Sequence, residues 1–200
     1  NAGDGETLTL TAAALTTSTS VATLDARNDT DGNIIIIGGA GADTLTGSAS
    51  DLGDSISGGA GAETLQFLTG KLDSLDTING GDGTDIISIL TDDTIEASTF
   101  TNISNVETLT SASAQHIVAT LGSAASTAGI ATVTLADTGG NDSVTVDATF
   151  SGALTVNAIT AGVSTVDLSS ATNTTTIKAS EAVMDNSVHV FTGGTSGTEI

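Results

Sequence analysis

Residues 38–45 read Gly-Gly-Ala-Gly-Ala-Asp-Thr-Leu, and the pattern returns at 58–65 as Gly-Gly-Ala-Gly-Ala-Glu-Thr-Leu and at 80–87 as Gly-Gly-Asp-Gly-Thr-Asp-Ile-Ile. Each copy combines three glycines, an acid, and an aliphatic residue two places after the acid. Glycine lets the backbone turn tightly, and an aliphatic residue at that distance fits a short strand facing a core. Three copies in this register predict a repetitive fold.

The spacing of the copies predicts how the chain winds. Asp43, Glu63 and Asp85 lie 20 and 22 residues apart, and weaker copies place Asp54 and Asp76 nine residues before Glu63 and Asp85. We therefore expect one strong and one weak turn per coil, with the strong turns stacked on one edge and the weak turns, near 34, 54 and 76, on the other. The inward aliphatic ladder would be Ile36, Leu45, Ile56, Leu65, Ile78 and Ile87.

The pattern G-G-x-G-x-[D/E]-x-U, with U aliphatic, resembles the nonapeptide repeat of RTX proteins, the haemolysin-type calcium-binding proteins. The resemblance implies a right-handed parallel β-roll that holds several calcium ions between successive glycine turns. Glu63 stands at the repeat position where the family has aspartate. The ligand set implied at the strong turns is Gly38, Gly39, Gly41, Asp43, Gly58, Gly59, Gly61, Glu63, Gly80, Gly81, Asp82, Gly83 and Asp85. The less regular opposite edge would add Asp29, Asp31, Asp51, Asp54, Asp73 and Asp76. The alternative is that these are plain β-turns.

The second half of the chain carries a different pattern. Short alternating runs such as 117–121, 133–135 and 144–146 predict half-buried strands. We expect a calcium-binding roll over residues 1–95 and a Thr/Ala/Ser-rich β-solenoid region over residues 96–200, with a β-sandwich as the alternative for the second region. A partial repeat at 194–200 suggests that the chain belongs to a longer array.

Two further segments bear on function. Ile103-Ser104-Asn105-Val106-Glu107-Thr108-Leu109 resembles a segment that follows RTX turns in bacterial S-layer proteins and large adhesins, whose strands are also rich in Thr, Ala and Ser. Residues 136–144 resemble a decayed calcium turn, in which Asp142, together with Asp137, either holds another ion or belongs to a plain turn.

Composition limits the possible partners. The 200 residues include 24 Asp or Glu and only 3 Lys or Arg, giving a formal net charge of -21. Nucleic acids and anionic membrane surfaces are therefore poor partners, and no apolar run is long enough for membrane insertion. A compact chain this acidic repels itself, which favours neutralisation by a hard cation such as calcium. The chain has no Cys, so thiolate sites are excluded.

We expect no enzyme activity, because no zinc-protease helix motif or nucleophile elbow is present. His116 and His189 each lie in a strand-like run, which favours a structural role over a catalytic one. The predicted function is a calcium-dependent structural segment of a secreted bacterial surface-layer protein that self-assembles on the cell exterior. In the RTX family this implies type I secretion as an unfolded chain. The alternatives are an adhesin or filament segment, with a cell-surface polysaccharide as candidate partner, and the secretion module of an RTX enzyme.

Overall fold

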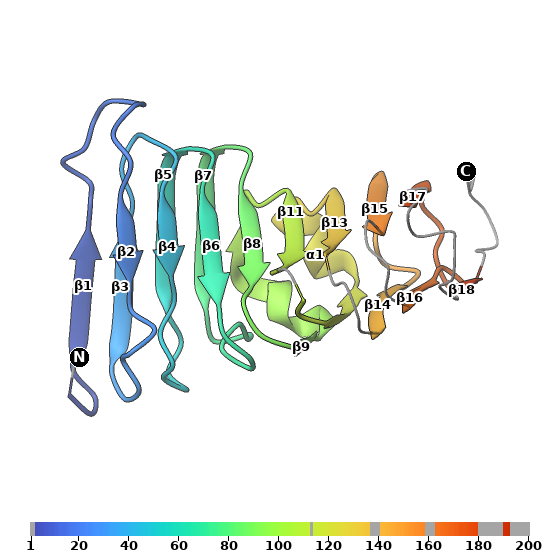
Figure 1. Cartoon of the computed structure of the whole chain (residues 1–200), viewed down its shortest axis with the longest axis horizontal. Coiled ribbons are helices and arrows are strands. Elements are labelled where there is room, and N and C mark those ends of the chain that lie inside the picture. The colour runs from blue at the N-terminus through green and yellow to red at the C-terminus, as the bar shows by residue number, and fades with distance from the viewer. Residues whose placement is uncertain (1–2, 113, 137–140, 159–162, 180–189, 193–200) are drawn as a thin grey trace.

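The computed structural model describes residues 3–112, 114–136, 141–158, 163–179 and 190–192. The described chain forms a β-solenoid, in which successive coils stack along the long axis of the molecule (Figure 1). Its strands belong to three sheets, here called A, B and C, and their pairings are parallel. The predicted β-solenoid is therefore confirmed.

Sheets A and B form the first half of the solenoid. Sheet A contains β1 (Thr7–Thr11), β3 (Asn33–Ile37), β5 (Ser55–Gly61), β7 (Thr77–Gly83) and β10 (Ile103–Ser104). Sheet B contains β2 (Thr23–Asp25), β4 (Thr44–Thr46), β6 (Thr64–Phe67), β8 (Ile86–Ile89), β11 (Thr108–Ser111), β13 (Thr132–Leu135), β15 (Leu154–Ala158) and β17 (Thr175–Ala179). From β1 to β8 the strands alternate between the two sheets, so each coil contributes one strand to each.

The core between the sheets is built from aligned aliphatic side chains. Ile36 pairs with Ile56 and Ile56 with Ile78 in sheet A. Leu45 pairs with Leu65 and Leu65 with Ile87 in sheet B. All six residues of the predicted ladder are at most 2% exposed. Parallel strands with one face buried fix the register in this way, because a slip by one residue would turn the aliphatic side chains outward.

The cross-section of the solenoid changes near residues 93–104. Sheet C begins there with β9 (Asp93–Ile95) and continues through β12 (Ile117–Leu121), β14 (Asn141–Val146), β16 (Val163–Asp167) and β18 (Val190–Thr192). Sheet A ends at β10, where the short helix α1 (Ser123–Ala128) packs against β10 and the 3-10 turn η1 (Ala97–Asn102). The backbone N–H of Val106 donates to the carbonyl of Ala128 at 3.1 Å.

Sheet B continues through this change without a break, since β8 pairs with β11 and β11 with β13. The second half of the chain is therefore also solenoid, and the alternative of a β-sandwich is wrong. The predicted boundary at residue 95 lies close to the change of cross-section, but the two predicted regions share one sheet. Asp137, His189 and the partial repeat at 194–200 lie outside the described residues.

Candidate cation sites at the glycine turns

The glycine turns of successive coils stack in direct contact. A Cβ atom at Gly38 would lie 1.9 Å from the carbonyl oxygen of Gly58, and one at Gly58 would lie 2.0 Å from that of Gly80. The next coil continues this column with Asn105, whose carbonyl oxygen would lie 1.9 Å from a Cβ at Gly80. No other residue type fits these three positions, so the repeated glycines are explained by the close approach of neighbouring backbones.

The second and third turns share one backbone conformation. Gly59 and Gly81 have φ values of 108° and 112°, and they are paired partners in sheet A. The first turn differs, because Gly39 faces the carbonyl oxygens of Ala12 and Leu15 in the loop that precedes β2. The two turns at 58–62 and 80–84 are therefore the equivalent pair, and the turn at 38–42 is covered by a loop of another sequence.

The acids of the three turns form a single row along this edge, as predicted. Asp43, Glu63 and Asp85 each precede a strand of sheet B, and each is at most 1% exposed. The backbone N–H of Glu63 donates to Oδ1 of Asp85 at 2.8 Å. Likewise the N–H of Ala22 donates to Oδ1 of Asp43 at 2.6 Å. Asp43 and Asp85 thus each satisfy an N–H of the preceding coil.

Sequence reasoning missed Glu107 as a member of this row. Its Oε2 accepts a hydrogen bond of 2.8 Å from the backbone N–H of Asp85. The signal was present in the sequence, because Glu107 follows Asp85 by 22 residues and is followed by Thr-Leu, as Glu63 is. Only the preceding glycine turn is missing.

The acids in the row differ in the number of hydrogen bonds that their carboxylate oxygens accept from the protein. Asp43 accepts a second hydrogen bond, from the N–H of Gly39 to Oδ2 at 2.6 Å. In contrast, three buried oxygens on the next two coils have no hydrogen-bond partner: Oε1 and Oε2 of Glu63 and Oδ2 of Asp85. Burial, followed by the neighbouring Asp85 carboxylate, raises the pKa of Glu63 to about 8. A buried carboxylate pair of this kind requires a proton or a cation.

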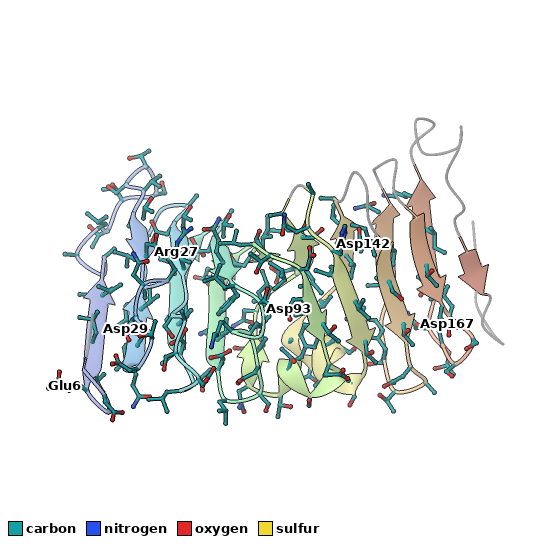
Figure 2. All side chains as sticks on the ribbon, turned by 60° about the horizontal axis from the view of Figure 1, so that its bottom comes forward. Glu6, Arg27, Asp29, Asp93, Asp142 and Asp167 are labelled. Atoms are coloured by element: carbon teal, nitrogen blue, oxygen red, sulfur yellow. The ribbon has the colours of Figure 1, made fainter. Side chains whose placement is uncertain are left out.

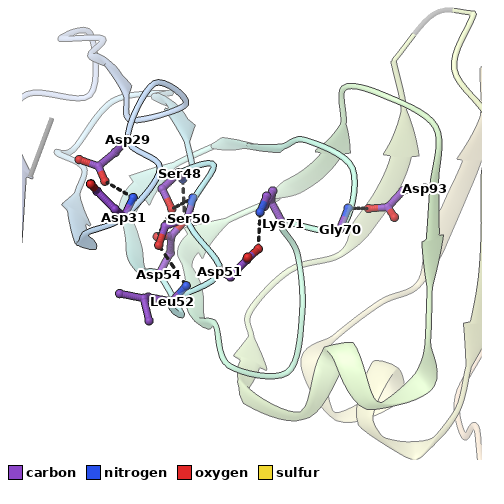
Figure 3. A network of polar contacts seen from close by, with 10 residues as sticks. All are labelled: Asp29, Asp31, Ser48, Ser50, Asp51, Leu52, Asp54, Gly70, Lys71 and Asp93. Atoms are coloured by element: carbon purple, nitrogen blue, oxygen red, sulfur yellow. Dashed lines mark hydrogen bonds and ion pairs between the residues drawn. The ribbon is translucent and has the colours of Figure 1, made fainter. Parts of the chain in front are cut away.

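The acids of the weaker edge are held by the protein itself (Figure 3). Asp54 accepts hydrogen bonds from the N–H and hydroxyl of Ser48 at 2.7 and 2.9 Å. Asp76 accepts one from the N–H of Asp54 and one from that of Asp73, both at 2.8 Å. Burial raises the pKa of Asp76 to about 6 and raises that of Asp54. This edge therefore offers fewer free oxygens than the strong turns.

The remaining predicted ligands occupy varied positions. Asp29 accepts from the N–H of Gly32 at 2.9 Å, while Oδ1 of Asp31 is buried without a partner. Asp51 forms an ion pair with Lys71, and its side chain is 93% exposed. Asp73 accepts from the N–H of Leu75, and Asp82 is exposed on the third glycine turn.

Asp142 lies on sheet C, far along the chain from the glycine turns. It is 3% exposed, and its Oδ1 accepts a hydrogen bond of 2.8 Å from the N–H of Ile117. The labelled acids in Figure 2 are spread along the solenoid rather than gathered at one point. Among the described residues, no three or more Asp, Glu or His side chains converge closely enough to hold a metal ion by themselves.

A cation at the strong turns would therefore need other oxygens. Calcium takes six to eight oxygen ligands and accepts backbone carbonyls beside carboxylates. Glu63 and Asp85 supply oxygens without donors, and the glycine turns bring carbonyl groups of neighbouring coils close to them. Oδ2 of Asp85 would lie 2.5 Å from a Cβ at Gly80, which shows how closely the carboxylate approaches the turn. The residues present thus fit a hard divalent cation.

Comparison with known proteins gives no relative for this chain: no family model, curated protein or solved structure matches it. Within the described part of the chain, no helix is both long and apolar enough to cross a membrane.

Proposed function

We propose that this chain is a calcium-dependent structural segment of a secreted bacterial surface-layer protein and that it has no catalytic role. The observation that carries the proposal is the group of three buried carboxylate oxygens without donors on neighbouring coils, at Glu63 and Asp85. Calcium would supply the positively charged partner that these buried carboxylate oxygens do not have in the protein itself. Glu63 and Asp85 would hold it together with carbonyl oxygens of the glycine turns.

Calcium binding at this place would be coupled to winding of the coils. The two carboxylates come from different coils and approach only when the coils are stacked. In the unfolded chain no such site exists, so the binding free energy contributes to folding. Without the cation, the buried like charges oppose stacking. This coupling suits a chain that is exported unfolded and folds outside the cell, as the resemblance to RTX proteins implies.

Self-assembly is supported by the distribution of charge. In a molecule of net charge -21, the outward positions of sheet B from β4 to β15 carry no ionisable side chain. The accessible ones are Thr44, Thr64, Gln66, Ile86, Thr108, Thr110, Thr132, Thr134, Thr155 and Asn157. Thr46 and Ser88 occupy the same columns but are buried. The acids lie mainly at the turns, so this face of sheet B can meet a neighbouring molecule without bringing many like charges together.

The proposal is tested by calorimetric titration with calcium and by thermal unfolding in calcium and in EGTA, with magnesium as a control ion. We expect calcium to raise the unfolding temperature and the double variant Glu63→Gln/Asp85→Asn to lose most of this gain. Asp51→Asn removes an exposed acid and should retain it. Identical unfolding curves in calcium and in EGTA would contradict the calcium assignment.

Electron microscopy tests the surface-layer assignment separately. Sheets or fibres should form on addition of calcium without any other ligand. A protein that binds calcium, remains monomeric and attaches to a polysaccharide would instead be an adhesin segment.

A further inference from the structure

The outward face of sheet B is built from two straight columns of residues. Its eight strands lie side by side along the long axis of the molecule (Figure 1). The strand registers align a first column from Thr23 on β2 to Thr176 on β17, which consists of seven threonines and Ile86. Because threonine is β-branched and stiff, this column presents a regular row of methyl and hydroxyl groups.

The second column has opposite charges at its two ends. It runs from Asp25 on β2 to Lys178 on β17, and both of these residues are exposed. The six positions between them are uncharged: Thr46, Gln66, Ser88, Thr110, Thr134 and Asn157. Lys178 is one of only three Lys or Arg residues in the chain. The column therefore has a direction, from negative to positive.

Polar groups of the second column already have partners within the same face. The Thr46 hydroxyl donates to Oε1 of Gln66 at 3.1 Å, and the Thr110 hydroxyl donates to the Thr134 carbonyl at 3.1 Å. Nδ2 of Asn157 donates to the Thr134 hydroxyl at 3.4 Å. Groups that keep their hydrogen bonds cost less to bury than unpaired ones, so another surface can cover this face at low cost.

A two-fold axis along the strand direction, between β8 and β11, makes this face complementary to itself. The rotation places each column opposite the same column of a second copy and reverses its order. Asp25 then faces Lys178 of the second copy, and threonines of the first column face threonines except where Ile86 meets Thr108. A two-fold contact uses the same surface on both copies, and opposite charges that meet across it fix the register.

Arg27 is compatible with this pairing. Its Nε lies 2.9 Å from Oδ2 of Asp25 in the same chain. A carboxylate has about four acceptor positions, so Asp25 can also accept from Lys178 of the second copy. Eight strands span about 34 Å. With two residues across each strand, the contact would bury on the order of 1,000 Å² in total, the lower limit for a specific interface.

We propose that two copies of this chain associate through the outward faces of sheet B, with their long axes antiparallel and with Asp25 of each copy against Lys178 of the other. The proposal rests on the self-assembly in the proposed function and names its contact and symmetry. The contact uses the face of the sheet and not its ends, so it is equally available in a longer solenoid. It requires wound coils, whichever ion winds them.

Sedimentation equilibrium in calcium, at protein concentrations up to about 1 mM, tests the contact, with circular dichroism as a separate measure of folding. Wild type should reach at least twice the 19.4 kDa mass of the chain. Thr108→Lys places two lysines close together near the two-fold axis and should raise the dissociation constant at least about tenfold. Thr77→Lys is the matched control, because Thr77 is exposed on sheet A, and it should leave the association unchanged.

The charged ends provide a test of register. Asp25→Lys and Lys178→Asp each oppose like charges and should weaken the association several-fold. The double variant Asp25→Lys/Lys178→Asp restores opposite charges and should recover most of the loss. Weakening in the double variant equal to the sum of the two single effects would contradict the pairing.

Cross-linking tests the antiparallel orientation, in a chain that has no cysteine of its own. A short bismaleimide should join a Thr23→Cys copy to a Thr176→Cys copy when the two are mixed, because the two-fold axis sets these positions opposite each other. Neither variant alone should cross-link, since its two cysteines lie at opposite ends of the contact. Self-cross-linking of Thr23→Cys without mixed product would overturn the orientation.

The failure of this proposal and that of the calcium proposal are distinguishable. A folded wild-type protein that stays monomeric, or an assembly that Thr108→Lys does not weaken, would overturn the sheet B contact and leave calcium binding untouched. If circular dichroism shows an unfolded chain in calcium, the calcium proposal fails instead. The sheet B contact is then tested in whichever ion restores the signal, and its absence there overturns it too.

Discussion

Oδ1 of Asp85 accepts a hydrogen bond of 2.8 Å from the backbone N–H of Glu63, the residue at the same position one coil earlier. The same relationship joins Asp43 to Ala22, Glu107 to Asp85, Asp76 to Asp54 and Asp142 to Ile117. In each case the acid precedes or begins a strand and satisfies an N–H where the parallel ladder starts. Burying an unsatisfied N–H is costly, so these acids have a structural role whether or not some also bind a cation.

This role can be separated from cation binding at Asp142. The variant Asp142→Ala leaves the N–H of Ile117 without its acceptor in the core of sheet C. We expect it to lower the free energy of unfolding by about 1–3 kcal/mol, measured by urea denaturation, and by the same amount in calcium and in EGTA. The control Asp4→Ala removes an exposed acid and should change stability little. A loss confined to calcium solutions would instead make Asp142 a ligand.

The variant Glu63→Gln is expected to stabilise the protein in the absence of calcium and to weaken calcium binding when the ion is present. Glu63→Gln keeps the shape of the side chain but removes a buried charge beside Asp85. Without calcium at pH 9 the variant should unfold at a higher temperature than wild type. In calcium it should bind the ion at least about tenfold more weakly, because a carboxylate ligand is lost. Glu6→Gln, on an exposed turn, should match wild type in both measurements.

The raised pKa values set the pH dependence of the calcium-free protein. Glu63 has a folded pKa of about 8 against an ordinary value of 4.5, and Asp76 one of about 6 against 3.8. The folded state therefore holds protons that the unfolded state has released, and stability must fall as pH rises through these windows. We expect the unfolding temperature in EGTA to fall between pH 4 and pH 8. Glu63→Gln should flatten the fall above pH 6, and a rise over this range would contradict the assignment.

The close stacking of the glycine turns can be tested with a matched pair of glycines. Gly83 has φ of 140°, and a Cβ there would lie 1.5 Å from the carbonyl oxygen of Gly61. Gly70 has φ of 63° and open space around it. Both substitutions by alanine carry the cost of a positive φ, about 1 kcal/mol or somewhat more. Only Gly83→Ala adds a backbone collision, so we expect it to prevent winding of the neighbouring coils. The measure is the β-type circular dichroism signal in calcium, and equal loss in the two variants would show that stacking does not matter.

The repeat spacing was sufficient to predict the solenoid, because acids that recur every 20 to 22 residues, each followed two places later by an aliphatic residue, place equivalent residues on the same column of successive coils. The ladder from Ile36 to Ile87 follows directly from that periodicity. The change of cross-section was not predicted, because residues 93–104 and the six-residue helix α1 carry no strong local signal. At Asn105 the glycine pattern is lost although the stacked column continues. Asn105 takes the place of a glycine there with φ of 52°, a conformation that asparagine tolerates better than most residues.

The site was predicted less completely than the fold. The row formed by Asp43, Glu63 and Asp85 was expected, but Glu107 was missed because no glycine turn precedes it. The role of these acids as acceptors for the preceding coil could not be read from spacing alone. It depends on which N–H groups the ladder leaves unpaired at the start of each strand, and that is a property of the stacked coils.

Because Glu63 and Asp85 occupy equivalent positions, a deletion of residues 64–85 would join Glu63 to Ile86 and preserve every column on either side. Insertion of a further coil at the same point would preserve them as well. Each such change alters the length of the molecule by one strand spacing, about 4.8 Å, and leaves the remaining contacts as they were. The solenoid can therefore become shorter or longer by whole coils while the packing of its core stays the same.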